Sequence, residues 1–145
     1  MSQDYRQQVN ELRARAAPLG RTPVRLALEE EAVRMADTHQ DTTLGFTLRR
    51  DLIQTATFCG HPEKSLVAFT WLLAQADRDP ERFPESQLMW QYKWIVNALD
   101  RFPQITRKQI EDALADMEAR YRRCGLTLKP LWKERTGMAD RKSVV

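Results

Sequence analysis

Apolar residues recur every three or four positions along most of this chain, which is the spacing of one face of an α-helix. The first such segment, about 2–17, carries Tyr5, Val9, Leu12 and Ala16 in this register. Similar stripes mark five more segments, at about 22–39, 41–59, 62–79, 85–99 and 106–124. The pattern predicts an all-α protein of about six helices.

The residues at the ends of these segments are typical of helix ends. Thr22, Asp41 and Thr106 stand where a side-chain oxygen can accept a hydrogen bond from a free backbone N–H. Gly60 and Gly125 follow the third and sixth segments, where a left-handed residue commonly ends a helix. Because the loops are short, consecutive helices should be antiparallel neighbours. We expect stacked antiparallel hairpins, as in a short α-solenoid, or an irregular bundle.

The stripes also predict which side chains form the core. The second helix should bury Val24, Leu28, Ala32 and Met35. The fourth carries two stripes, Leu66, Phe69, Leu73 and Ala76 on one and Val67, Trp71 and Ala74 on the other, so we expect it to be sandwiched between neighbours. The inner faces of the last two helices are Leu88, Tyr92, Ile95 and Leu99, and Ile110, Leu114, Met117 and Tyr121.

Composition favours a globular, cytosolic protein. Hydrophobic residues make up 42% of the 145 positions and charged residues 30%, a balance unlike that of a disordered or membrane protein. No apolar run approaches the roughly 20 residues that span a bilayer, and the first residues are polar, without the apolar core expected of a signal peptide. We expect one helical domain over residues 1–125 and a basic tail, partly docked, over 126–145.

Positive charge is concentrated near the C-terminus. Residues 117–145 carry a net charge of +5, within a chain whose net charge is +3. The candidate contacts for nucleic acid or another anionic partner are Arg120, Arg122, Arg123, Lys129, Lys133 and Arg135. Against this hypothesis, the same helix is acidic before Arg120, and cations at a helix C-terminus are also favoured by the helix dipole.

Catalytic and metal-binding patterns are weak. Cys59 and His61 flank a turn glycine, but a metal site needs three or four converging ligands and the only other histidine is His39. No phosphate-binding glycine motif and no nucleophile elbow is present. Both cysteines, Cys59 and Cys124, are expected to be small buried residues of a reducing compartment. We therefore expect no catalytic activity, no cofactor and no metal.

Residues 52–79 resemble a divergent tetratricopeptide repeat. Leu52, Gly60, Ser65 and Phe69 match the leucine, turn glycine, small residue and aromatic of that family, and Asp79-Pro80 is similar to its terminal Asp-Pro. The sequence departs from the family at Ile53 and Ala56, and the Asp-Pro comes about three residues late. Residues 85–124 have the length of a second repeat but lack the turn glycine.

The resemblance implies a protein-interaction module in which the first helix of each pair lines a groove for a peptide or a helix. The implied contacts are Arg50, Gln54 and Thr57 of the third helix and Trp90, Trp94 and Asn97 of the fifth. Exposed tryptophan and arginine often anchor interfaces, although two tryptophans at helical spacing are also common in cores. A further alternative is assembly with a second copy, because a short array leaves apolar faces at its ends.

Overall fold

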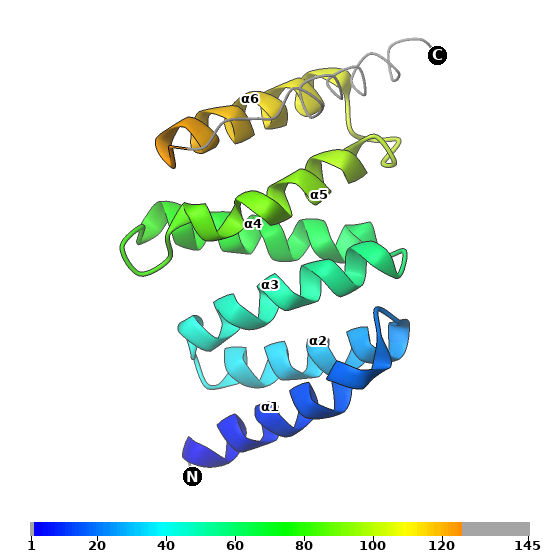
Figure 1. Ribbon diagram of the computed structural model, residues 1–145, viewed down its shortest axis with the longest axis vertical. Coiled ribbons are helices and arrows are strands. Elements are labelled where there is room, and N and C mark those ends of the chain that lie inside the picture. Colours follow the sequence, from blue (N-terminus) through cyan, green and yellow to red (C-terminus); the bar gives the residue numbers. More distant parts are fainter. Residues whose placement is uncertain (1, 126–145) are drawn as a thin grey trace. The chain divides into compact units, whose positions relative to one another are not determined.

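A computed structural model of the protein describes residues 2–125, with side chains from Tyr5 onward. Its helices are α1 (Ser2–Ala16), η1 (Ala17–Leu19), α2 (Pro23–Thr38), α3 (Thr42–Phe58), α4 (Pro62–Arg78), η2 (Glu85–Leu88), α5 (Met89–Leu99) and α6 (Arg107–Arg123) (Figure 1). No strand occurs within the described range, so the all-α prediction with six α-helices is confirmed. The expected fifth helix differs at its start, where the first turn is the 3-10 helix η2.

The chain divides into two compact units within α4, between Leu72 and Leu73. Unit 1 contains α1, α2, α3 and most of α4, and unit 2 contains the end of α4, η2, α5 and α6. The single domain expected over residues 1–125 stays a prediction.

Helix starts follow the capping residues expected from the sequence. Thr22 Oγ1 accepts a hydrogen bond from the N–H of Arg25 at 3.3 Å, and Asp41 Oδ1 accepts one from Leu44 at 3.1 Å. Thr106 forms a reciprocal capping box with Gln109, with bonds of 3.1 and 2.7 Å. Because each bond satisfies a free N–H of the first turn, these local contacts fix where the helices begin.

In unit 1, α2 packs against both α1 and α3. A core cluster is formed by Val9, Ala32, Ala36 and Leu48, with Leu12, Val33, Met35 and Leu44 packed against it. The buried face of α2 differs from the predicted stripe, since Val24 is 64% exposed while Glu29 is buried. The true face contains a charged residue, which an apolar pattern alone does not identify.

The α3–α4 hairpin of unit 1 packs tightly around a small buried residue. Ser65 is 1% exposed, and its hydroxyl donates to the backbone oxygen of Ile53 at 3.2 Å. Phe69 of the first predicted stripe is buried, but Leu66 of that stripe is only half-buried. Leu72, which neither predicted stripe contains, is fully buried, so the core-facing side of α4 is displaced from the prediction. The other predicted face is not covered as expected, because Val67 is 73% exposed.

The inner faces predicted for α5 and α6 are largely confirmed in unit 2. The buried side chains are Leu88, Tyr92, Ile95 and Leu99 on η2 and α5, and Ile110, Met117 and Tyr121 on α6. The Tyr121 hydroxyl donates to the backbone oxygen of Met89 at 3.0 Å and joins the two helices. Among the described helices, none has both the length and the apolar composition needed to cross a membrane.

Candidate interaction surfaces

Helix α5 of unit 2 places a tryptophan on the surface. Trp90 is 60% exposed, and its ring meets that of the half-buried Trp94 edge to face, with centroids 6.0 Å apart. The ammonium group of Lys93 lies 4.9 Å from the Trp90 ring centroid, within the range of a cation–π contact. Asn97 is half-buried one turn beyond Lys93. Trp90 is therefore exposed enough to contact a partner, whereas Trp94 is partly buried.

The residues predicted on α3 have intramolecular contacts within unit 1. Gln54 Oε1 accepts a hydrogen bond from Arg21 Nη2 at 2.7 Å. Thr57 Oγ1 lies 2.9 Å from Ser65 Oγ, and Arg50 is half-buried. These residues belong to a different unit from Trp90, Trp94 and Asn97, so a common groove between the third and fifth helices stays a prediction.

Unit 1 has a groove of its own, which sequence reasoning missed. It has a volume of about 370 Å³ and is lined by Glu30, Val33, Arg34, Arg49, Leu52, Glu63, Lys64, Val67 and Ala68 of α2, α3 and α4. A salt bridge of 3.0 Å between Lys64 and Glu30 joins α4 to α2 beside it. The exposed second stripe of α4 was the available signal, because Val67 lines this groove.

Arg49 is held in place beside this groove by two kinds of contact. Its guanidinium lies 3.9 Å from the centroid of the Trp71 ring and forms a salt bridge of 2.7 Å with Asp37. Gly45, one turn earlier, leaves room for it, because a Cβ there would lie 3.0 Å from Arg49 Nη1. The arrangement links α2, α3 and α4 through one side chain. It also directs the hydrogen-bonding groups of Arg49 to Asp37 rather than to a ligand.

Arg120 of α6 is the centre of an ionic cluster in unit 2. It is 7% exposed, and its guanidinium contacts Asp77 at 2.9 Å, Glu85 at 3.0 Å and Asp116 at 2.8 Å. Hydrogen bonding to Arg120 lowers the pKa of Asp77, and the same bonds raise the pKa of the arginine. This cluster ties the end of α4 and η2 to α6.

The basic residues predicted to bind anions therefore differ in availability. Arg120 is enclosed by carboxylates, and Arg123 forms a salt bridge of 2.9 Å with Glu85, which lowers the pKa of Glu85. Arg122 is paired with Glu118 at 3.1 Å, but its side chain is 73% exposed. Three further candidates, Lys129, Lys133 and Arg135, lie outside the described residues. Anion binding stays a prediction, for which Arg122 and Arg123 are the accessible members of α6, because the Arg123 side chain is also 57% exposed.

The thiol and imidazole groups near the α3–α4 turn do not form an activated pair. Burial raises the pKa of the Cys59 thiol, which favours the protonated form. His61 Nδ1 lies 3.2 Å from the Glu63 carboxylate. Within residues 2–125, no group of three or more His, Cys, Asp or Glu side chains is placed to hold a metal ion.

No protein-family model, curated protein or solved structure matches this chain. The resemblance to tetratricopeptide repeats therefore stays a prediction.

Proposed function

We propose that this protein is a non-catalytic interaction module that binds an amphipathic helix or extended peptide of a partner protein through α5. The observation that carries the proposal is the 60% exposure of Trp90. A tryptophan left in water keeps a large apolar area available for burial, and tryptophan is among the residue types most enriched at interface hot spots.

The chemistry around Trp90 indicates what the partner segment should offer. Burying the exposed part of this side chain would contribute about 3 kcal/mol, from roughly 130 Å² of apolar area. Lys93 is the cation beside the ring, so an acidic residue flanking the partner's apolar anchor would complement it. Asn97 adds an amide that can donate and accept hydrogen bonds. We therefore expect a segment with an apolar anchor and an acidic neighbour.

The proposal is tested by comparing proteins retained from a lysate by the full chain and by two variants. Trp90→Ala should lose a stoichiometric partner while its circular dichroism matches that of the parent, because the side chain is mostly exposed. Its melting temperature should fall only slightly, because the contacts with Trp94 and Lys93 are lost. Phe58→Ala is the matched control, since Phe58 is 59% exposed on α3 in unit 1. It should retain the partner.

Equal retention by Trp90→Ala and the parent would contradict the proposal, as would equal loss in both variants, which indicates nonspecific adhesion. Nuclease treatment of the retained material separates the alternative. A partner lost on digestion would assign binding to nucleic acid and to the basic segment that contains Arg122.

A further inference from the structure

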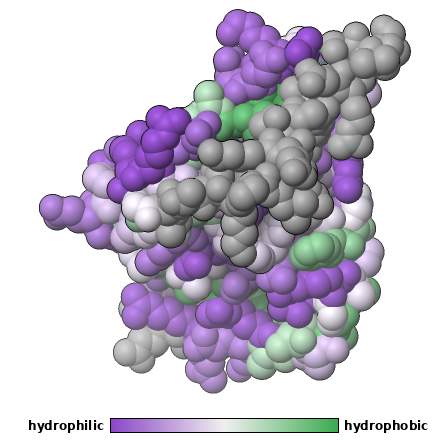
Figure 2. Space-filling view, turned by 45° about the horizontal axis from the view of Figure 1, so that its top comes forward, coloured by the Kyte–Doolittle hydropathy of each residue, from purple (hydrophilic) through white to green (hydrophobic). Residues whose placement is uncertain are grey.

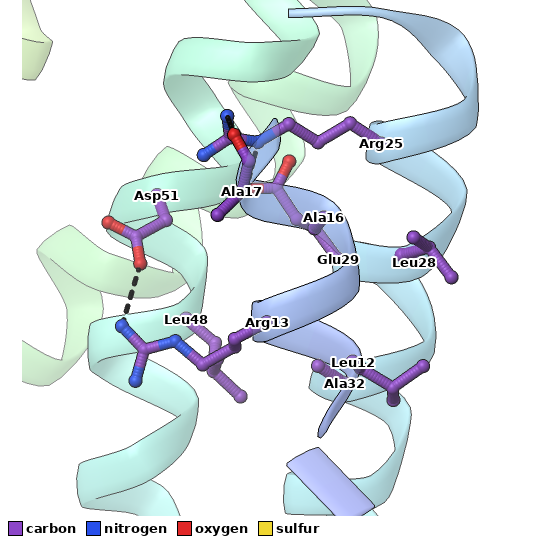
Figure 3. A pocket seen from close by; sticks show the side chains of 10 residues that line it. All are labelled: Leu12, Arg13, Ala16, Ala17, Arg25, Leu28, Glu29, Ala32, Leu48 and Asp51. Atoms are coloured by element: carbon purple, nitrogen blue, oxygen red, sulfur yellow. Dashed lines mark hydrogen bonds and ion pairs between the residues drawn. The ribbon is translucent and has the colours of Figure 1, made fainter. Parts of the chain in front are cut away.

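A cavity of about 180 Å³ lies between α1, α2 and α3 of unit 1 (Figure 3). Its walls are Leu12, Arg13, Ala16, Ala17, Arg25, Leu28, Glu29, Ala32, Leu48 and Asp51. Three of these are alanines, whose short side chains leave the space open, and three are leucines, which form the apolar part of a lining that is otherwise polar. An apolar protein cavity of about 150 Å³ is known to hold benzene, so this one has room for a molecule of about six to nine non-hydrogen atoms.

The polar end of the cavity is formed by Glu29 and Arg25. Glu29 is 8% exposed, and its Oε1 accepts no hydrogen bond from any described residue. Arg25 Nε lies 3.6 Å from Glu29 Oε2, longer than a hydrogen bond, and it too has no acceptor. Burial raises the pKa of Glu29, and the Thr55 hydroxyl and nearby arginines only partly oppose the rise. A buried acceptor and a buried donor therefore lie side by side without a partner among the described side chains, and each needs a hydrogen bond with another group.

The rim of the cavity is a second ion pair. Arg13 Nη2 and Asp51 Oδ2 are 3.2 Å apart, and their side chains are 43% and 48% exposed (Figure 3). Exposed pairs of this kind contribute little stability, so a ligand can displace it at small cost. The four charged residues of the lining are two cations and two anions. The lining therefore has no net charge, and it favours neither a cationic nor an anionic ligand.

We propose that this cavity binds a small neutral molecule that carries a primary carboxamide on a compact apolar body. The amide N–H would donate to the Glu29 carboxylate, and the amide oxygen would accept from Arg25 Nε. The apolar body would pack against Leu12, Leu28 and Leu48. Only a group with a donor beside an acceptor satisfies both buried atoms at once, and a carboxamide does so without adding charge. This binding site is independent of the surface around Trp90.

The test is an NMR titration of the full chain with four ring compounds of similar size. Benzamide has the donor and the acceptor, toluene has neither, benzoate has only acceptors, and benzylammonium has only donors. Benzamide should shift amide resonances of α1 and α2 around the cavity. Toluene should bind about tenfold more weakly, the factor for losing roughly 1.4 kcal/mol of hydrogen bonding. Benzoate and benzylammonium should also bind more weakly than benzamide.

Two variants test whether Glu29 is the residue that recognises the amide. Glu29→Met keeps the length of the side chain but removes the carboxylate, so it should abolish the preference for benzamide over toluene. Asp51→Asn is the matched control at the rim, and it should keep that preference. The comparison among ligands on the parent protein remains decisive even where Glu29→Met does not fold.

Equal affinity for toluene and benzamide would overturn the proposal, because it shows an apolar cavity without polar recognition. Tighter binding of benzoate or benzylammonium would also overturn it, since charge would then be recognised. So would a preference that survives in Glu29→Met, resonance shifts confined to the groove around Val67, or no shift up to the solubility limit of benzamide.

Discussion

Replacing Arg120 with methionine should destabilise the protein by about 2–3 kcal/mol. Removing one partner from a fully buried ion pair costs roughly 3–5 kcal/mol, because the remaining charge is left without compensation. Arg120 is buried, but its partners are less so, since the side chains of Asp77, Asp116 and Glu85 are 57%, 43% and 19% exposed. Water can therefore solvate two of the three carboxylates in the variant. Glu85 also keeps its salt bridge with Arg123, so the loss of stability should be smaller than for a fully buried ion pair.

Urea denaturation followed by far-UV circular dichroism measures this cost. Arg122→Met is the matched control, because it removes the same group from the same helix at a side chain that is 73% exposed. The control should change the free energy of unfolding by less than about 0.5 kcal/mol. A loss of about 2–3 kcal/mol corresponds to a fall in melting temperature of roughly 5–10 °C for a chain of this size.

The pH dependence provides a second readout of the same cluster. Arg120 lowers the pKa of Asp77 in the folded state, so this carboxylate stabilises the fold above its unfolded pKa. That contribution is lost as the pH falls through the folded pKa. The gap between parent and Arg120→Met should therefore narrow below about pH 4. An Arg120→Met protein as stable as the control at neutral pH, or a gap that widens on acidification, would refute the reasoning.

Two further predictions concern buried polar groups of unit 1. Ser65→Ala should lower the free energy of unfolding by about 1 kcal/mol or more in urea denaturation, because it removes the bond to Ile53 and the contact with Thr57. Thr70→Ala on the exposed face of α4 should have almost no effect. Equal losses in the two variants would contradict this. Glu29→Gln should raise the melting temperature at neutral pH, because the raised pKa of Glu29 means that its ionised form destabilises the fold above its unfolded pKa. The melting temperature of the parent should approach that of Glu29→Gln as the pH falls through the folded pKa of Glu29. A difference in melting temperature that does not depend on pH would show that ionisation is not the cause.

The fold class could be predicted from the sequence because its causes are local. The three-to-four spacing of apolar residues predicted the helices, and Thr22, Asp41 and Thr106 predicted three of their starts. The inner faces of α5 and α6 followed from the same periodicity. In each case the signal, a capping contact or an apolar stripe, lies within a single helical segment, so a short stretch of sequence is enough to predict it.

The candidate sites could not be obtained in this way, because they depend on contacts between distant residues. Arg120 and Asp77 are 43 positions apart, and nothing near Arg120 in the sequence separates a buried ion-pair centre from a solvated helix end. Glu29 lies within a run of three glutamates, yet only packing against α1 and α3 buries it beside Arg25. Sequence alone determined that the chain is helical and where several helices begin and end. The tertiary structure decided which charges are buried and which apolar side chains face solvent, because burial depends on neighbours that only the folded chain brings together.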